Sequence, residues 1–436
     1  MAERSEAVEE QAVRDASAVY AVKPEIATAE DVPPGYKRTE VGVIPEEWSV
    51  KTAAELGQIV TGGTPPTNVL AYWGDEYPWV TPTDITERKD IDATERHITT
   101  AGLRAIRSLP PKSVLVTCIA SIGKNAVLQA AGGCNQQINA VIPGEGNESD
   151  FLYYLFEFYK TYLVGKAGTT ATSIISKGIF SGLQFAIPQK EEQRAIATAL
   201  SDADALIESL DRLIAKKRAI KQAAMQQLLT GQTRLPGFTG EWETKRLGDV
   251  GKIVTGGTPS TLQKSFWGGP YPWVTPTDIS SGRDIYSSER QLTEAGLEVI
   301  SELPSNAVLV TCIASIGKNA ILKKQGGCNQ QINAIILSSS YSPEFLYYLI
   351  DFSSSILKGR AGTTATSILS KSGFSDLEFN FPGEAEQNAI VSVLSDMDAE
   401  LESLERRRDK ARQIKQGMMQ QLLTGRVRLV TPEVAA

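Results

Sequence analysis

The chain has 436 residues, of which 42% are apolar and 22% are charged, and its formal net charge is −7. This length allows two or three domains with their own cores, and the composition is that of a soluble globular protein. No apolar run approaches the roughly 18 residues that span a bilayer, and the amino terminus has no secretory apolar core. We therefore expect a cytoplasmic protein.

The negative charge at first argues against a nucleic-acid partner, but it is unevenly distributed. Residues 1–31 carry eight acidic and three basic residues, which leaves the rest of the chain at only −2. Charge therefore neither supports nor excludes DNA binding. We assign residues 1–34 to an acidic amino-terminal extension, for which a short helix and a disordered arm both remain open.

The next segment is rich in Thr, Val, Ile and aromatic residues and is punctuated by Gly and Pro, which indicates short strands and loops. Within it, residues 114–119 form the clearest predicted strand and residues 151–164 predict a helix that packs on the sheet. Residues 191–230 then contain no Gly or Pro, and their apolar residues alternate steps of three and four. This predicts a helix about 60 Å long. Its seam would be formed by Leu200, Ala203, Ile207, Leu210 and Ile214.

The whole organisation then returns at an offset of 194 residues without a gap. Between Gln58 and Pro143, 54 of the 86 positions are identical to their partners 194 residues later. Such a unit is far longer than a solenoid repeat and indicates a duplicated domain. A second long helix is predicted over residues 385–424, ending before Gly425 as the first ends before Gly231. The predicted divisions are 1–34 (extension), 35–188 (first domain), 189–231 (helix), 232–382 (second domain) and 383–436 (helix and tail).

Each long helix has a narrow apolar stripe that must be buried. The fold class that we predict is mixed α/β, with two globular domains separated by two long, antiparallel coiled-coil helices and an approximate two-fold symmetry. The alternative is that each helix folds back onto its own domain. Basic clusters on the helices, at residues 216–221 and 406–415, fit a solvated helix face, or attraction to DNA or to an acidic partner, equally well.

The sequence offers little for catalysis. The four cysteines lack C-x-x-C spacing and lie in or beside apolar runs, so we interpret them as reduced, buried thiols, and the one histidine, His97, has no repeat equivalent. Residues 119–125 resemble the end of a P-loop, but the upstream glycine is missing and Asn125 replaces the magnesium-binding Ser or Thr. No glycine-rich cofactor loop or amino-methyltransferase motif is present. We therefore expect no catalytic residue, metal or cofactor on this chain. The cysteines are Cys118, Cys134, Cys312 and Cys328.

Repeated turn segments carry residue types that read DNA. Asn, Gln, Lys, Ser and Thr side chains contact base edges, and backbone amides and basic groups hold phosphates. The first repeat supplies the candidates Thr61, Gly62, Gly63, Thr64, Thr83, Asp84, Lys124, Asn125, Gln136, Gln137, Thr169 and Thr170. The second supplies Thr255, Gly256, Gly257, Thr258, Thr277, Asp278, Lys318, Asn319, Gln330, Gln331, Thr363 and Thr364. The alternative is that these turns are scaffold and that less similar stretches, such as residues 68–72 and 86–89, discriminate between sequences.

Across roughly residues 36–432 the chain resembles the specificity subunit of a type I restriction–modification system. The strongest marks are the two helix endings, residues 221–231 (KQAAMQQLLTG) and 415–425 (KQGMMQQLLTG). The helix entries, residues 188–196 and 382–390, and the domain openings, residues 42–48 and 236–242, are also similar to that family. The set is doubled and in the family's order.

The resemblance implies that two target-recognition domains each read half of a bipartite double-stranded DNA target. The helices would set the spacing and dock two methyltransferase subunits, to which a restriction subunit can add. The partners would bind S-adenosylmethionine and methylate adenine, so this chain would do no chemistry. Two similar readers related by a two-fold axis predict a nearly palindromic, interrupted target with half-site centres roughly 34 Å apart. The rival hypothesis is a non-enzymatic scaffold whose repeats bind protein.

Overall fold

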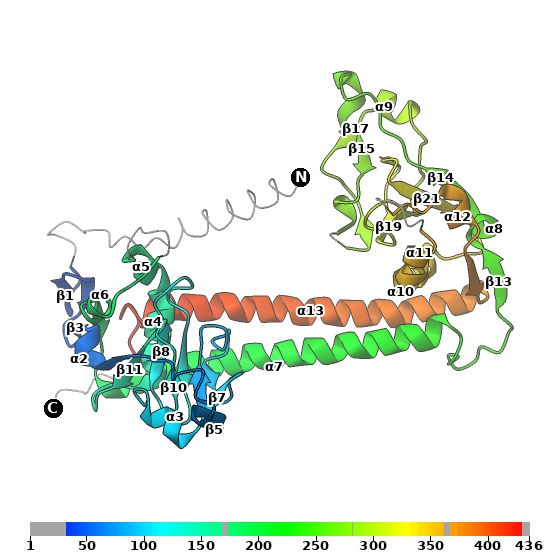
Figure 1. The fold of residues 1–436 in the computed structure, drawn as a ribbon. Helices are drawn as coiled ribbons and strands as arrows, with labels where there is room; N and C mark the ends of the chain where they lie inside the picture. The colour runs from blue at the N-terminus through cyan, green and yellow to red at the C-terminus, as the bar shows by residue number, and fades with distance from the viewer. Residues whose placement is uncertain (1–31, 168–172, 281, 362–366, 430–436) are drawn as a thin grey trace. The chain divides into compact units, whose positions relative to one another are not determined.

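The computed structural model describes residues 32–429, except 168–172, 281 and 362–366 (Figure 1). Most of the acidic extension therefore lies outside the described residues. The chain divides into two compact units, residues 1–209 with 408–436 and residues 210–407. Each unit combines one globular body with parts of both long helices, so each is described by itself.

The first body is built on a five-stranded sheet with the strand order β4-β11-β8-β9-β6. A three-stranded sheet, β10-β5-β7, and two strand pairs, β1-β2 and β12-β3, complete it. The strands are β1 (Tyr36–Thr39), β2 (Gly42–Pro45), β3 (Ser49–Thr52), β4 (Gly57–Thr61), β5 (Trp73–Val80), β6 (Asp90–Ile91), β7 (His97–Ile98), β8 (Val114–Thr117), β9 (Asn125–Leu128), β10 (Gly133–Cys134), β11 (Ile138–Pro143) and β12 (Gln184–Ile187). The helices are α2 (Ala53–Leu56), α3 (Thr100–Arg104), α4 (Ser149–Phe158), α5 (Lys160–Gly165) and α6 (Lys177–Ser181), with a 3-10 turn η1 (Leu70–Tyr72).

The sheet is buried on both faces because alternate side chains of a strand point to opposite sides. On β8, Val114 and Val116 pack with α4 in one hydrophobic cluster, whereas Leu115 belongs to a second cluster with Leu109. The predicted strand and the predicted helix on the sheet are both present (Figure 1). The helix is not continuous, however, because α4 ends and α5 begins around Tyr159, whose ring packs edge-on against Phe185.

The second body repeats this topology except for the strand pair β1-β2, which has no counterpart among its described strands. Its sheets are β14-β21-β18-β19-β16, β17-β15-β20 and β13-β22. The strands are β13 (Glu243–Arg246), β14 (Gly251–Thr255), β15 (Trp267–Val274), β16 (Asp284–Ile285), β17 (Gln291–Leu292), β18 (Ala307–Thr311), β19 (Asn319–Leu322), β20 (Gly327–Cys328), β21 (Ile332–Leu337) and β22 (Glu378–Phe381). The helices are α8 (Leu247–Val250), α9 (Glu294–Glu298), α10 (Pro343–Phe352), α11 (Ser354–Gly359) and α12 (Lys371–Ser375), with 3-10 turns η2 (Lys264–Phe266) and η3 (Asp278–Ser280).

The two long helices are α7 (Lys190–Leu229) and α13 (Glu384–Leu422), within two residues of the predicted ranges. The predicted apolar seam is buried at Leu200, Leu210 and Ile214. In the second unit Lys217 pairs with Glu400 at 2.7 Å and Lys221 pairs with Asp398. Residue numbers along α13 thus decrease in the direction in which those along α7 increase. The helices therefore run antiparallel there, which confirms the prediction of a mixed α/β protein with two long antiparallel helices.

The basic clusters on these helices are largely internal ion pairs. Besides Lys217 and Lys221, Arg218 pairs with Glu405 in the second unit, and Lys415 pairs with Asp204 at 2.6 Å in the first. Neither interpretation of these clusters from the sequence, a solvated helix face or attraction to DNA or an acidic partner, included ion pairs between the two helices. Much of this positive charge is thus neutralised within the protein.

The same three-residue contact joins each body to the helices of its own unit. In the first unit the Tyr154 hydroxyl donates to Asp204 at 2.7 Å, and the Lys415 ammonium lies 5.4 Å from the Tyr154 ring centroid. In the second unit Tyr348, Asp398 and Lys221 repeat this arrangement at 2.7 and 5.4 Å. Asp204 thus receives a hydroxyl from the body and an ammonium from α13.

Replacing Tyr154 with phenylalanine should destabilise the first unit by about 1.5–3 kcal/mol, because it removes a hydrogen bond to a charged acceptor without creating a cavity. Urea unfolding of the variant measures the loss. Tyr36, whose hydroxyl donates to the Gly425 carbonyl oxygen at 2.9 Å, provides a neutral-acceptor comparison. Its phenylalanine variant should lose only about 0.5–1.5 kcal/mol. Equal losses would show that the Asp204 charge adds nothing.

A buried carboxylate at the start of each long helix fixes the entry to each body. In the first unit Glu192 accepts from Trp48 Nε1 at 2.9 Å and from Arg428, which follows the end of α13, at 2.6 Å. In the second unit Glu386 accepts from Trp242 Nε1 at 3.2 Å and from Arg234. The segment after α13 therefore does for the first body what the segment after α7 does for the second.

The four cysteines are free and buried, as the sequence predicted. Burial raises the pKa of the Cys118 thiol to about 11 and that of Cys134 to about 12. Burial likewise raises the pKa of the Cys312 thiol to about 11 and that of Cys328 to about 12. All four thiols therefore remain protonated in the folded protein at neutral pH.

Alkylation by iodoacetamide at pH 8 should be slow in the folded protein and fast in urea, because the thiolate is the nucleophile. Mass spectrometry after timed quenching measures both rates. The thiol pKa values in the folded protein exceed the unfolded value of about 8.5, so the contribution of these thiols to the free energy of unfolding is fully present below pH 8.5. That contribution should decline as the pH rises toward about 11, because the unfolded thiols lose their protons first. Rapid alkylation of the folded protein would contradict the burial.

Candidate nucleic-acid interface

The Gly-Gly-Thr-Pro turn and the Asn-Gln-Gln turn of the first repeat lie against each other. The antiparallel pairing of β4 with β11 places Thr61 opposite Asn139, and the Thr61 hydroxyl donates to Asn139 Oδ1 at 2.7 Å. Beyond the strand ends, the Thr64 hydroxyl donates to Gln136 Oε1 at 2.7 Å, and both side chains are exposed. The pairing of the sheet thus brings two turns from distant parts of the sequence to one edge.

The glycines of the first turn serve close packing. The Gly62 amide donates to the Ile138 carbonyl at 3.0 Å, and the Gly63 amide to the Cys134 carbonyl at 2.8 Å. A Cβ atom at Gly62 would lie 2.1 Å from the Asn135 carbonyl oxygen, so only glycine fits there. Trp79 Nε1 also donates to the Gly63 carbonyl at 2.9 Å. The suggestion that these amides hold phosphates is therefore not supported, because the fold already uses them.

The turn after β5 is held by one carboxylate. Asp84 Oδ2 accepts from the Thr81 amide at 2.7 Å and its hydroxyl at 2.6 Å, and Asp84 Oδ1 accepts from the Glu95 amide at 2.8 Å. Both oxygens thus tie two loops together, which makes Asp84 a scaffold residue. The neighbouring Thr83 is exposed. This turn meets the Asn-Gln-Gln turn, because the Asn135 amide donates to the Val80 carbonyl at 2.9 Å.

A fourth loop, between β8 and β9, joins the same edge. The Cys118 amide donates to the Gln137 carbonyl at 2.8 Å. Lys124 lies at the end of this loop and is exposed, and within the described part of the chain its ammonium has no hydrogen-bond or ion-pair partner. Lys318 is exposed in the equivalent place of the second body. Both lysines fit the role of a phosphate contact.

The adjacent asparagines do not fit the predicted role. Asn125 is only 3% exposed, and its Nδ2 donates to Glu157 at 3.0 Å. Asn319 is 7% exposed. Each asparagine is the first residue of an inner strand, β9 or β19, and its side chain is buried in the body. We therefore remove them from the candidate DNA contacts.

The second body reproduces these contacts closely. Thr258 donates to Gln330 at 2.6 Å, and Asp278 accepts from the Thr275 amide at 2.8 Å and the Glu289 amide at 2.9 Å. The side chains that remain at the surface in both bodies are Thr64, Thr83, Lys124 and Gln136, with Thr258, Thr277, Lys318 and Gln330. Partly exposed are Gln137 and Gln331. The candidates Thr169, Thr170, Thr363 and Thr364 lie outside the described residues.

The sequence reasoning missed one exposed arginine in each repeat. The Arg96 guanidinium carbon lies 3.7 Å from the Trp73 ring centroid, and Arg290 lies 3.6 Å from that of Trp267. The available signal was a Glu-Arg pair, residues 95–96, that recurs at 289–290 within an otherwise dissimilar stretch.

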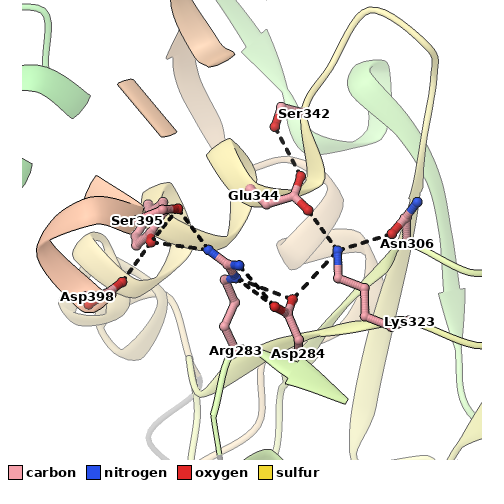
Figure 2. Close-up of polar contacts among 9 residues, drawn as sticks. Arg283, Asp284, Asn306, Lys323, Ser342, Glu344, Ser395 and Asp398 are labelled. Carbon is pink, nitrogen blue, oxygen red and sulfur yellow. Dashed lines mark hydrogen bonds and ion pairs between the residues drawn. The ribbon is translucent and has the colours of Figure 1, made fainter. Parts of the chain in front are cut away.

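The two bodies differ in how they meet the helices. Figure 2 shows Arg283 between Asp284, at 3.0 Å, and Ser395 of α13, also at 3.0 Å, while Lys323 holds Glu344 at the start of α10. In the first body the repeat position of Arg283 is Lys89, which itself pairs with Asp150 at the start of α4. The arginine of the second body is thus available to contact the long helix.

Two features bear on other classes of protein. In the described ranges no group of three or more His, Cys, Asp or Glu residues is placed to hold a metal ion. No helix in those same ranges is both long and apolar enough to cross a bilayer.

Comparison with known proteins agrees with this duplication. The family model of the type I restriction modification DNA specificity domain matches the chain twice, at residues 45–216 and 239–413. Two solved structures share the fold. A chain from a study of complex assembly and conformational transition of the type I R-M system has a TM-score of 0.60 at 16% identity, covering 88% of this chain and 99% of its own. The S subunit of such a system from M. genitalium has a TM-score of 0.55 at 14% identity, covering 86% and 96%.

Curated relatives point to the same family. The MjaIX specificity subunit of Methanocaldococcus jannaschii is 30% identical over 275 residues, 58% of this chain and 63% of the relative. The HindI specificity subunit of Haemophilus influenzae is 32% identical over 34% of this chain and 33% of its own. The putative MjaX specificity subunit of M. jannaschii is 23% identical over 91% and 97%. The chain thus spans less than two thirds of the first two relatives.

Proposed function

The chain belongs to the family of type I restriction–modification DNA specificity subunits, and from that premise we propose that its two bodies read the two halves of one interrupted DNA target. The observation that carries the proposal is the loop cluster at the edge of each sheet, with exposed Thr, Gln and Lys side chains at positions 194 residues apart. These residue types contact base edges and phosphates.

The two half-sites should be similar and inverted. Thr64, Gln136 and Lys124 have counterparts of the same type in the second body, and the hydrogen bond between the threonine and the glutamine is 2.7 Å long in the first body and 2.6 Å in the second. Two readers with the same groups in the same geometry favour similar base sequences. The proposed inversion of one half-site relative to the other would make the target nearly palindromic.

Partner enzymes would supply the chemistry. We propose that two methyltransferase subunits, with S-adenosylmethionine bound to them, dock on the long helices and methylate adenine at the target, and that a restriction subunit can join them. On α7, Leu213 and Ile220 are 38% and 43% exposed and lie seven residues apart on one face of the helix. Apolar side chains at this spacing fit a protein partner.

A pull-down from the native host, combined with single-molecule sequencing of methylated adenines with and without this gene, tests the proposal. We expect a methyltransferase in the pull-down and the loss of one interrupted, nearly palindromic methylated motif. An asymmetric motif would contradict the inference about the half-sites but keep the function. No partner and an unchanged methylome would favour the protein scaffold.

Replacing Lys124 with alanine should weaken DNA binding by the complex about equally for all sequences. A lysine that contacts one phosphate contributes a slope of about 0.9 to the dependence of log K on log salt, and this slope should fall by that amount. Fluorescence anisotropy at several salt concentrations measures it. Lys37, an exposed lysine on β1, is the control with the same loss of charge. Equal slopes in the two variants would exclude Lys124 as a phosphate contact.

A further inference from the structure

The strongest unassigned feature is a stacked arginine in each body. Arg96 lies on Trp73, which meets Trp79 edge-on with centroids 5.1 Å apart. Arg290 lies on Trp267, which meets Trp273 in the same way at 5.1 Å. The proposed DNA contacts at the Thr, Gln and Lys side chains do not include these residues.

The main chain of Arg96 is fixed as firmly as its side chain. The Arg96 carbonyl accepts from the Trp79 amide at 3.1 Å and from the Thr94 hydroxyl at 2.6 Å. The preceding residue, Glu95, is tied through its amide to Asp84. Arg290 has the corresponding contacts with the Trp273 amide at 3.2 Å and the Ser288 hydroxyl at 2.6 Å.

This fixed arginine lies at the candidate interface. Trp73 Nε1 donates to the Pro66 carbonyl at 3.3 Å, and Trp79 Nε1 to the Gly63 carbonyl, so the tryptophans under Arg96 also hold the Gly-Gly-Thr-Pro turn. Asp84 connects the Arg96 segment to the turn that carries Thr83. Arg96 is therefore connected, through these tryptophans and through Asp84, to two of the four clustered loops.

The guanidinium groups are available for a ligand. Both arginines are exposed, and across the described residues neither guanidinium has a carboxylate within ion-pair distance. Stacking on an aromatic ring restricts the guanidinium plane and leaves the N–H donors at its edge. A planar fork of this kind matches the N7 and O6 acceptors of guanine in the major groove.

The surroundings favour a base over a phosphate. Exposed carboxylates, Glu95 and Glu289, directly precede the two arginines and oppose the approach of phosphate. Lys124 and Lys318 have no such neighbour in sequence. The arginines are therefore better placed to read than to anchor.

Resting on the proposed function, we propose that Arg96 and Arg290 each read a guanine, at the same position of the two half-sites. The tryptophan under each arginine holds the guanidinium in the orientation for this contact. Each arginine then specifies one base of the half-site read by its own body, independently of the other.

The test selects a random-sequence DNA duplex library on the complex of this chain with its methyltransferase partner. The wild-type complex should enrich a motif with a guanine at matching positions of both halves. Arg96→Ala should relax only the guanine of one half, with discrimination there falling roughly 5- to 150-fold, and Arg290→Ala only that of the other. The half that stays intact shows in each case that the variant folds and binds.

Two further variants separate the outcomes. Arg96→Lys keeps the charge but loses the planar fork, and it should relax the same base. Arg104→Ala removes an exposed charge from α3, where the second body has Glu298, and it should change no base preference. A loss of affinity that is uniform over all sequences, or a lower melting temperature with an unchanged motif, would overturn the proposal. If the wild-type complex enriches no motif, the proposed function itself fails.

Discussion

Replacing Arg428 with alanine should lower the free energy of unfolding of the first unit by about 3–5 kcal/mol, because it leaves an unpaired charge in a buried site. Glu192 is 1% exposed and accepts from Arg428 Nε at 2.6 Å. When the arginine is removed, the Glu192 carboxylate keeps the hydrogen bond from Trp48 Nε1, which is 2.9 Å long. Urea unfolding of the variant measures the loss, and hydrogen exchange of peptides from the first turns of α7 serves as the readout for this unit.

Two comparisons isolate the cause. Arg426 is exposed and lies two residues earlier, so Arg426→Ala should change stability by less than about 0.5 kcal/mol. Replacing Arg428 with an apolar residue and Glu192 with glutamine should recover part of the loss, because the buried charge is removed while the glutamine carbonyl can still accept from Trp48 Nε1. Equal effects of the Arg428 and Arg426 variants would show that the ion pair is unimportant.

The same contact in the second unit gives the result a wider meaning. Arg234 precedes the second body in the sequence, and Arg428 follows the last helix, α13. Each arginine nevertheless forms an ion pair with the buried glutamate in the first turn of a long helix. Arg234→Ala should therefore destabilise the second unit and not the first. The segment after α13 is then a structural part of the first body.

The long helices were the most predictable part of the fold. Helix period, the absence of Gly and Pro, and a glycine stop are local signals, and α7 and α13 follow them to within two residues. By contrast, β6, β7 and β10 have two residues each and exist only through their partners in the sheets. Their residues carry no local pattern, because pairing with distant strands decides their conformation.

The candidate site was predictable as a set of turns but not residue by residue. Neighbouring residues of one motif have opposite roles: Thr83 is exposed, whereas Asp84 ties two loops together. Similarly, Lys124 is exposed and Asn125 is buried at the start of β9. Scaffold residues and surface residues are both repeated in the sequence, so only their burial and hydrogen bonds in the structure separate them. Arg96 was missed because its importance comes from a ring 23 positions earlier in the sequence.

The adjacent glycines of the first turn provide the sharpest test of the interface. A Cβ atom at Gly62 would lie 2.1 Å from the Asn135 carbonyl oxygen and 2.4 Å from that of Cys134. At Gly63 the nearest atom is Ile106 Cγ2 at 3.5 Å, an ordinary contact. Gly62→Ala must therefore displace the Asn-Gln-Gln turn, whereas Gly63→Ala fits.

We expect Gly62→Ala to destabilise the first unit by about 1–3 kcal/mol and to remove recognition of one half-site. Discrimination at the bases contacted by the displaced turn should fall roughly 5- to 150-fold, and Gly63→Ala should resemble the wild type. Library selection on the complex measures both variants. The second body carries a similar pair: Gly256 has a clash at 2.2 Å, and Gly257 has its nearest contact at 3.3 Å, which is tighter than the one at Gly63. Gly256→Ala should therefore damage the other half of the motif. A folded Gly62→Ala variant with an unchanged motif would mean that the two turns hold the sheet edge together without touching DNA.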